Sequence, residues 1–189
     1  MPNWVVNKIN LMGNNKENSE MLNFIKGKEG YGNIDFNEII PMPNYIYTGD
    51  LGIEEHKKYG KNNWYDWSIE NWGCKWNASM SCSFSGGVVF ETPWDSPVPI
   101  FKRLTELFPK VDMEMTYADE DMGRNIGRVT YINGVFTINR YDAYQDGNLA
   151  WDIYIDLWGE NECLKKRRKW KLATTRLLLL KTHRFIYTY

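Results

Sequence analysis

Alternating hydrophobic and polar positions predict six strands along this chain. Residues 4–12 place Val5, Ile9 and Leu11 on one side of a first strand. Further strands are predicted at residues 79–84, 88–91, 111–117, 128–132 and 135–140, and residues 34–40 also read as extended. The last two strands flank Asn133-Gly134, a dipeptide that strongly favours a two-residue hairpin turn. Ser85-Gly86-Gly87 predicts a second hairpin in the same way.

Helical spacing of apolar residues predicts helices between these strands. Met21, Leu22, Phe24 and Ile25 share one face of a helix that Asn18 or Ser19 would cap. Shorter helices are expected near residues 53–59 and 64–71, and a longer one begins at Pro99. Residues 151–158 fit either a strand or the start of a helix. This order of elements predicts an α+β fold with the helices packed on one face of the sheet.

Composition and charge divide the chain into two parts. Its 189 residues are 43% hydrophobic and 15% aromatic, enough apolar material for one domain with a buried core. The net charge is only −1, but nine of the 23 basic residues and a single acid lie in residues 161–189. We therefore predict an acidic domain over residues 1–160 and a basic C-terminal extension over residues 161–189.

The sequence also limits the classes of protein to consider. No apolar run approaches the ~18–20 residues that span a bilayer, and the first residues lack the pattern of a secretion signal. The three cysteines have no CxxC spacing, which favours a reducing cytoplasm over a disulfide framework or a zinc site. With only two histidines and no phosphate-binding loop, the sequence predicts no metal, no cofactor and no catalytic residue.

Five segments recur together in a known family. They are Met1-Pro2-Asn3-Trp4, residues 36–43 (FNEIIPMP), residues 70–78 (ENWGCKWNA), residues 92–99 (TPWDSPVP) and residues 117–127 (YADEDMGRNIG). In order and approximate spacing the set resembles the YubB-type ferredoxin-like domain of phage- and plasmid-borne proteins. The resemblance implies a ferredoxin-like antiparallel sheet and an origin in a mobile element, hence a bacterial host cytoplasm. It implies no established activity, cofactor or catalytic residue.

The tryptophan-rich segment at residues 70–78 has two interpretations. Trp72 and Trp76 flank Gly73, whose missing Cβ permits a sharp turn between a helix and a strand. The two indoles either fill a corner of the core or, with Trp64 and Trp94, line a binding groove.

Asp119-Glu120-Asp121 is the densest acidic cluster, and it too allows several interpretations. The DxDxDG spacing of a calcium loop is absent, so a metal site has little support. Glu91 and Asp95 could approach the cluster to form the paired carboxylates of a hydrolase. The simplest interpretation is a solvated acidic loop.

Three functions remain, in order of preference. The first is a stoichiometric binder that inhibits a host defence system, such as a CRISPR-associated nuclease, by offering an acidic, aromatic surface to a basic channel. The second is a nucleic-acid-binding accessory protein that uses sheet aromatics and the basic extension. The third is an enzyme with an unfamiliar carboxylate site. The predicted partner-binding residues are Trp72, Trp76, Glu91, Trp94, Asp95, Asp119, Glu120 and Asp121; the predicted anion-binding residues are Lys165, Lys166, Arg167, Arg168 and Lys169.

Overall fold

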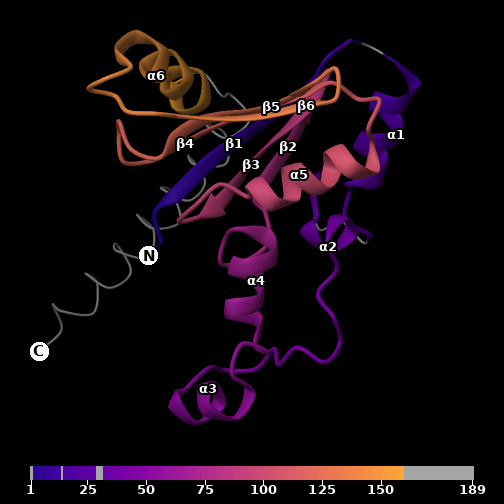
Figure 1. Cartoon of the computed structure of the whole chain (residues 1–189), viewed down its shortest axis with the longest axis vertical. Helices are drawn as coiled ribbons and strands as arrows, with labels where there is room; N and C mark the ends of the chain where they lie inside the picture. Colours follow the sequence, from indigo (N-terminus) through magenta and orange to yellow (C-terminus); the bar gives the residue numbers. More distant parts are fainter. Residues whose placement is uncertain (1, 14, 29–31, 160–189) are drawn as a thin grey trace, which may run out of the picture.

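A six-stranded antiparallel sheet forms the centre of the protein (Figure 1). The computed structural model describes residues 2–13, 15–28 and 32–159, so the predicted extension at 161–189, with Lys165–Lys169, lies outside the described residues. The spatial order is β2-β3-β1-β4-β5-β6, with β1 in an interior position. The strands are β1 (Trp4–Leu11), β2 (Ser79–Phe84), β3 (Gly87–Pro93), β4 (Met113–Asp119), β5 (Ile126–Ile132) and β6 (Val135–Tyr141).

The connections between strands are those of a ferredoxin-like domain. A helical crossover joins β1 to β2, a hairpin joins β2 to β3, and α5 (Val98–Leu107) joins β3 to β4. The resulting order β4-β1-β3-β2 is that of the split βαβ arrangement, extended here by the β5–β6 hairpin. The first crossover contains α1 (Lys16–Phe24), α2 (Phe36–Ile39), α3 (Ile53–Tyr59) and α4 (Trp64–Trp72). These findings confirm the predicted α+β, ferredoxin-like class.

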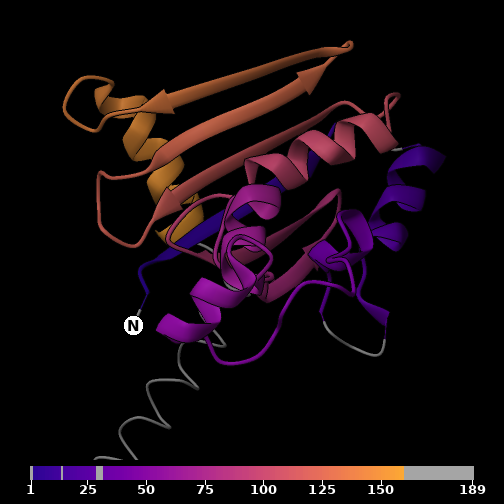
Figure 2. The same cartoon turned by 60° about the horizontal axis from the view of Figure 1, so that its bottom comes forward.

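The main core lies between one face of the sheet and helices α1, α2, α4 and α5 (Figures 1 and 2). Alternate strand residues such as Ile9, Phe90 and Met115 point to this face and are buried. From the helical layer, Phe36 packs edge-on against both Trp72 and Phe90, with ring centroids 5.8 and 5.9 Å away. The sheet aromatics Phe90 and Tyr117 are thus covered by side chains and present no stacking surface to nucleic acid.

A smaller cluster occupies the opposite face of the sheet. Helix α6 (Gly147–Tyr154) and the following π-helical turn η2 (Ile155–Gly159) pack there, where Ile153 and Leu157 meet Val6 and Val89. Figure 1 shows α6 across the sheet from α5. The prediction of helices on one face therefore holds for α1, α2, α4 and α5, whereas α3 buries no residue and α6 packs on the opposite face.

Local sequence signals account for most element boundaries. Asn133 and Gly134 both have positive φ, 51° and 78°, as a type I′ turn requires, so the predicted β5–β6 hairpin is confirmed. The prediction of an extended segment at 34–40 is wrong for residues 36–39. There, the Asp35 side chain accepts a hydrogen bond from the Asn37 N–H at 2.8 Å and caps the short helix α2.

Candidate functional site

Three chain segments meet at one end of the sheet. Strand β1 lies between β3 and β4, with Trp4 opposite Pro93 and Val5 opposite Asp119. The residues that follow β3 and the residues that follow β4 therefore both lie beside the start of β1. Asn125 connects the two loops, since its side-chain amide donates to the Trp94 carbonyl at 3.4 Å and to Asp95 Oδ1 at 3.5 Å.

Trp94 occupies the apex of a strained turn. The Asp95 N–H donates to the Pro93 carbonyl at 2.9 Å, which closes a three-residue γ-turn with Trp94 at its centre. The φ of Trp94 is +71°, a region that residues with a Cβ adopt at a cost of roughly 1–2 kcal/mol. The Trp94 N–H bonds to the Asn3 carbonyl at 2.9 Å, yet 53% of the residue stays exposed. The fold thus holds a large aromatic side chain at the surface in a strained conformation.

The acidic cluster is bound to the first residues of β1. Glu120 accepts a hydrogen bond from the Trp4 N–H at 3.1 Å, and the Asn3 side chain donates to Asp121 at 3.0 Å and to Asp119 at 3.4 Å. Asp119 is 6% exposed and also accepts from the Asp121 N–H at 2.8 Å. Desolvation raises the pKa of Asp119 above its usual value, and the charges of Asp121 and Glu120 add to the increase. Asp119 is therefore a structural residue, whereas Glu120 and Asp121 are exposed.

Besides Asp119, two more of the predicted partner-binding residues are buried. Trp72 is 4% exposed in the main core, and its indole N–H donates to the Ile40 carbonyl at 2.9 Å. Glu91 is also 4% exposed and lies opposite Val6, so it points to the α6 face of the sheet and away from Asp95. The core interpretation is thus correct for Trp72, and neither residue is part of an exposed surface. Trp76 is half-buried and packs against Trp4, with ring centroids 6.5 Å apart.

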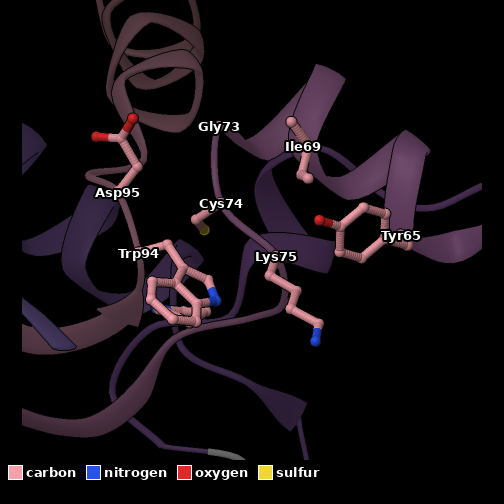
Figure 3. A pocket seen from close by; sticks show the side chains of 8 residues that line it. Tyr65, Ile69, Gly73, Cys74, Lys75, Trp94 and Asp95 are labelled. Carbon is pink, nitrogen blue, oxygen red and sulfur yellow. The ribbon is translucent and has the colours of Figure 1, made fainter. Parts of the chain in front are cut away.

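A cavity of about 270 Å³ lies beside Trp94 (Figure 3). Figure 3 shows Trp94 and Tyr65 on opposite sides of the cavity, with the Tyr65 hydroxyl directed toward its centre and Cys74 behind. Asp95 supplies a carboxylate at one end. Lys75 and Cys74 also line the cavity, so a partner's side chain would meet two rings, one carboxylate, one ammonium side chain and a thiol. The lining residues are Tyr65, Ile69, Gly73, Cys74, Lys75, Pro93, Trp94 and Asp95.

Lys75 forms part of the cavity wall and is surrounded by aromatic rings. Its ammonium nitrogen lies 4.7 Å from the ring centroid of Trp76, 5.6 Å from that of Tyr65 and 6.0 Å from that of Trp64. These distances are typical of cation–π attraction, which holds the long side chain against the aromatic wall. Of the four tryptophans in the predicted groove, only Trp94 lines this cavity; Trp64 and Trp76 contact Lys75, Trp72 is buried, and Tyr65 and Lys75 were not predicted.

The described residues offer little support for catalysis. Within residues 2–13, 15–28 and 32–159 no group of three or more His, Cys, Asp or Glu side chains could hold a metal ion. Cys74 is a free thiol, but it is buried, and desolvation raises its pKa well above the usual value, which disfavours the nucleophilic thiolate.

No helix among the described residues is long and apolar enough to cross a bilayer. The prediction that the chain has no membrane span is consistent with this finding over the part of the chain that the structure describes.

Comparison with known proteins supports the fold assignment. Residues 71–162, just under half of the chain, match the family described as a ferredoxin-like domain in Api92-like proteins. The match begins at the end of α4 and includes both hairpins, α5 and α6. Searches of curated proteins and of solved structures gave no significant match. The chain is thus similar, over residues 71–162, to the ferredoxin-like domain of Api92-like proteins, and its sheet has the architecture that this description names.

Proposed function

We propose that this protein is a stoichiometric binder whose partner docks on the loops at the Trp94 end of the sheet. The observation that carries the proposal is Trp94 itself, exposed at the apex of a strained turn beside a cavity. Strained backbone persists only where surrounding structure enforces it, and it is concentrated at binding and active sites. Here Asn3 and Asn125 provide that enforcement by bonding the Trp94 backbone on both sides.

Tryptophan at this position suits a binding hot spot. Its rigid side chain offers a large contact area and loses little conformational entropy when a partner covers it. The neighbouring cavity can receive a side chain from the partner while Trp94 packs against the partner's surface. Truncation of such a residue to alanine typically costs about 2–4 kcal/mol of binding free energy, or roughly 30- to 1,000-fold in Kd.

Charge near the site favours a basic partner. Asp95, Glu120 and Asp121 are exposed carboxylates on the two loops, and the two loops are joined through Asn125. A cluster of like charge accelerates encounter with a surface of opposite charge and loses this effect as salt screens the field. Combined with the resemblance to phage and plasmid proteins, this supports a finer proposal: an inhibitor of a host defence nuclease, encoded by a mobile element and acting in the bacterial cytoplasm.

The first test is a comparison of variants in partner capture. Tagged wild-type protein is used to pull down partners from a lysate of a bacterial host, and both proteins and nucleic acids are identified. The captured partner is then titrated with wild-type protein, Trp94→Ala and the control Tyr45→Ala, an exposed aromatic (72%) in the segment between α2 and α3. We expect Trp94→Ala to raise Kd at least 30-fold and Tyr45→Ala to leave it unchanged.

Charge is tested without disturbing the fold. Glu120→Gln and Asp121→Asn keep the oxygen acceptors that bind the Trp4 N–H and the Asn3 side chain, but remove both negative charges. The double variant should associate more slowly at low salt and equal the wild type at high salt. Inhibition at strongly sub-stoichiometric amounts would instead indicate catalysis, and capture of RNA or DNA alone would favour the nucleic-acid-binding alternative.

A further inference from the structure

The two edges of the sheet differ in how they are protected. At the β2 edge, the backbone N–H and the side-chain amide of Asn33 bond to Ser81 at 2.7 and 3.0 Å, and the register between β2 and β3 shifts between Ser79 and Cys82. Covering loops and bulges are standard means of preventing an edge strand from pairing with another chain. At the opposite edge, β6 pairs with β5 in unbroken register over seven residues.

Most side chains on β6 are exposed and uncharged. Val135 is 63% exposed and Ile138 is 46% exposed, and the strand contains one charged residue, Arg140, and no proline. Natural edge strands usually carry charges, proline or bulges that prevent pairing. Of these features β6 has only the one charge, and none of the described strands pairs with its outer edge, so this edge can accept another strand.

The β5–β6 register shows which backbone groups face outward. Ile132 and Val135 flank the two-residue turn and form its hydrogen-bonded closing pair, so bonding to β5 alternates from Val135 onward. Residues 135, 137, 139 and 141 therefore bond to β5. Phe136, Ile138 and Arg140 direct their N–H and C=O groups away from the sheet.

This outward-facing edge is complementary to itself. If two copies of β6 run antiparallel about a two-fold axis at Ile138, each outward-bonding residue faces another one: Ile138 faces Ile138, and Phe136 faces Arg140 of the other copy. At the intervening positions, Thr137 faces Asn139 of the other copy and Val135 faces Tyr141 of the other copy. No like charges are opposed, each Arg140 lies beside a phenyl ring, and the remaining pairs are apolar–apolar or polar–polar.

We propose that two copies of this chain associate through β6 and form one continuous twelve-stranded antiparallel sheet. The three outward-bonding residues of each copy supply one N–H and one C=O each, so about six hydrogen bonds join the copies. A single strand pair buries less surface than the ~1,200 Å² of a stable interface, and the association is accordingly weak and concentration-dependent. The interface is isologous, because the same strand of each copy forms it, so the assembly closes at two copies and does not polymerise.

Sedimentation velocity of the full-length protein over a range of concentrations tests the proposal. The wild type should shift reversibly from monomer to dimer as its concentration rises. Ile138→Lys places two ammonium groups against each other at the axis and should give a monomer at every concentration. The matched control Thr137→Lys adds the same charge one residue away, opposite Asn139 of the other copy, and should still dimerise. Circular dichroism and melting temperature verify that both variants fold.

Crosslinking tests the register independently of affinity. Ile138→Cys brings two cysteines directly opposite each other, within the Cα separation that a disulfide spans, whereas Thr137→Cys leaves its cysteines offset along the strands. Under mild oxidation only Ile138→Cys should give a covalent dimer in high yield. A wild type that stays monomeric at all concentrations, or an Ile138→Lys variant that still dimerises, would overturn the proposal.

Discussion

Replacing Trp94 by alanine and by glycine separates the strain at this site from its side-chain contacts. Both changes remove the indole, of which about half is buried. If roughly 100 Å² of apolar surface is lost at ~25 cal/mol per Å², each variant loses about 2.5 kcal/mol of folding free energy. Alanine keeps its Cβ in the +71° region and retains a strain of roughly 1–2 kcal/mol, which glycine relieves.

The expected result is an inversion of the usual order of alanine and glycine. Elsewhere alanine is more stable than glycine by about 0.4–1 kcal/mol, because glycine has more conformations to lose on folding. At position 94 the relief of strain exceeds this entropy, so Trp94→Gly should be more stable than Trp94→Ala by about 0.5–1 kcal/mol. For a chain of 189 residues, each kcal/mol of difference in stability shifts Tm by about 2–4 °C.

Urea unfolding monitored by circular dichroism gives both free energies, and Trp76 provides the control pair. Trp76 is not among the residues with positive φ, so Trp76→Ala should be more stable than Trp76→Gly. If alanine were the more stable residue at position 94 as well, the strain argument would be refuted. The case for Trp94 as a binding residue would then rest on its exposure and on the neighbouring cavity.

Three further predictions follow from individual contacts. Burial raises the pKa of Asp119 in the folded state, so the wild type loses stability as pH rises through that pKa and the buried carboxyl ionises. In urea unfolding at pH 7, Asp119→Asn should therefore be at least as stable as the wild type. Any gain in the free energy of unfolding should disappear in acid, below the unfolded-state pKa, where the wild-type carboxyl is neutral as well. Trp72→Phe leaves the Ile40 carbonyl without its donor and should lower the free energy of unfolding by about 1–3 kcal/mol, which the same assay measures. The described residues contain no metal-binding cluster, and EDTA should leave Tm unchanged; a drop of more than a few degrees would contradict this.

Local chemistry made parts of the fold predictable from the sequence. Asn133-Gly134 specifies a hairpin because both residues tolerate positive φ, and that turn is present as predicted. The sequence also allowed Asp95 to approach the acidic cluster at residues 119–121, and the loop that carries Asp95 does lie beside the loop after β4, because both follow strands that flank β1. These features depend on short-range turn chemistry or on strand order.

The remaining features of the site depend on long-range packing. Glu91 has the sequence character of a surface residue, but its place opposite Val6 turns it toward the α6 face of the sheet. The role of Asn3 follows from the position of β1 between β3 and β4, which no local pattern encodes. Residues 34–40 contain several apolar side chains that fit a strand, and the cap from Asp35 decides in favour of a helix over residues 36–39.

The position of β1 in the sheet has a consequence for the rate of folding. Its partners lie far away along the chain: Asn7 pairs with Phe90 and Lys8 pairs with Thr116. The β2–β3 and β5–β6 hairpins join near neighbours and can form in microseconds, whereas β1 must wait until two distant segments meet on either side of it. During synthesis β1 is made before either of its partners, so its buried valines and isoleucine cannot be fully covered until both β3 and β4 have been made.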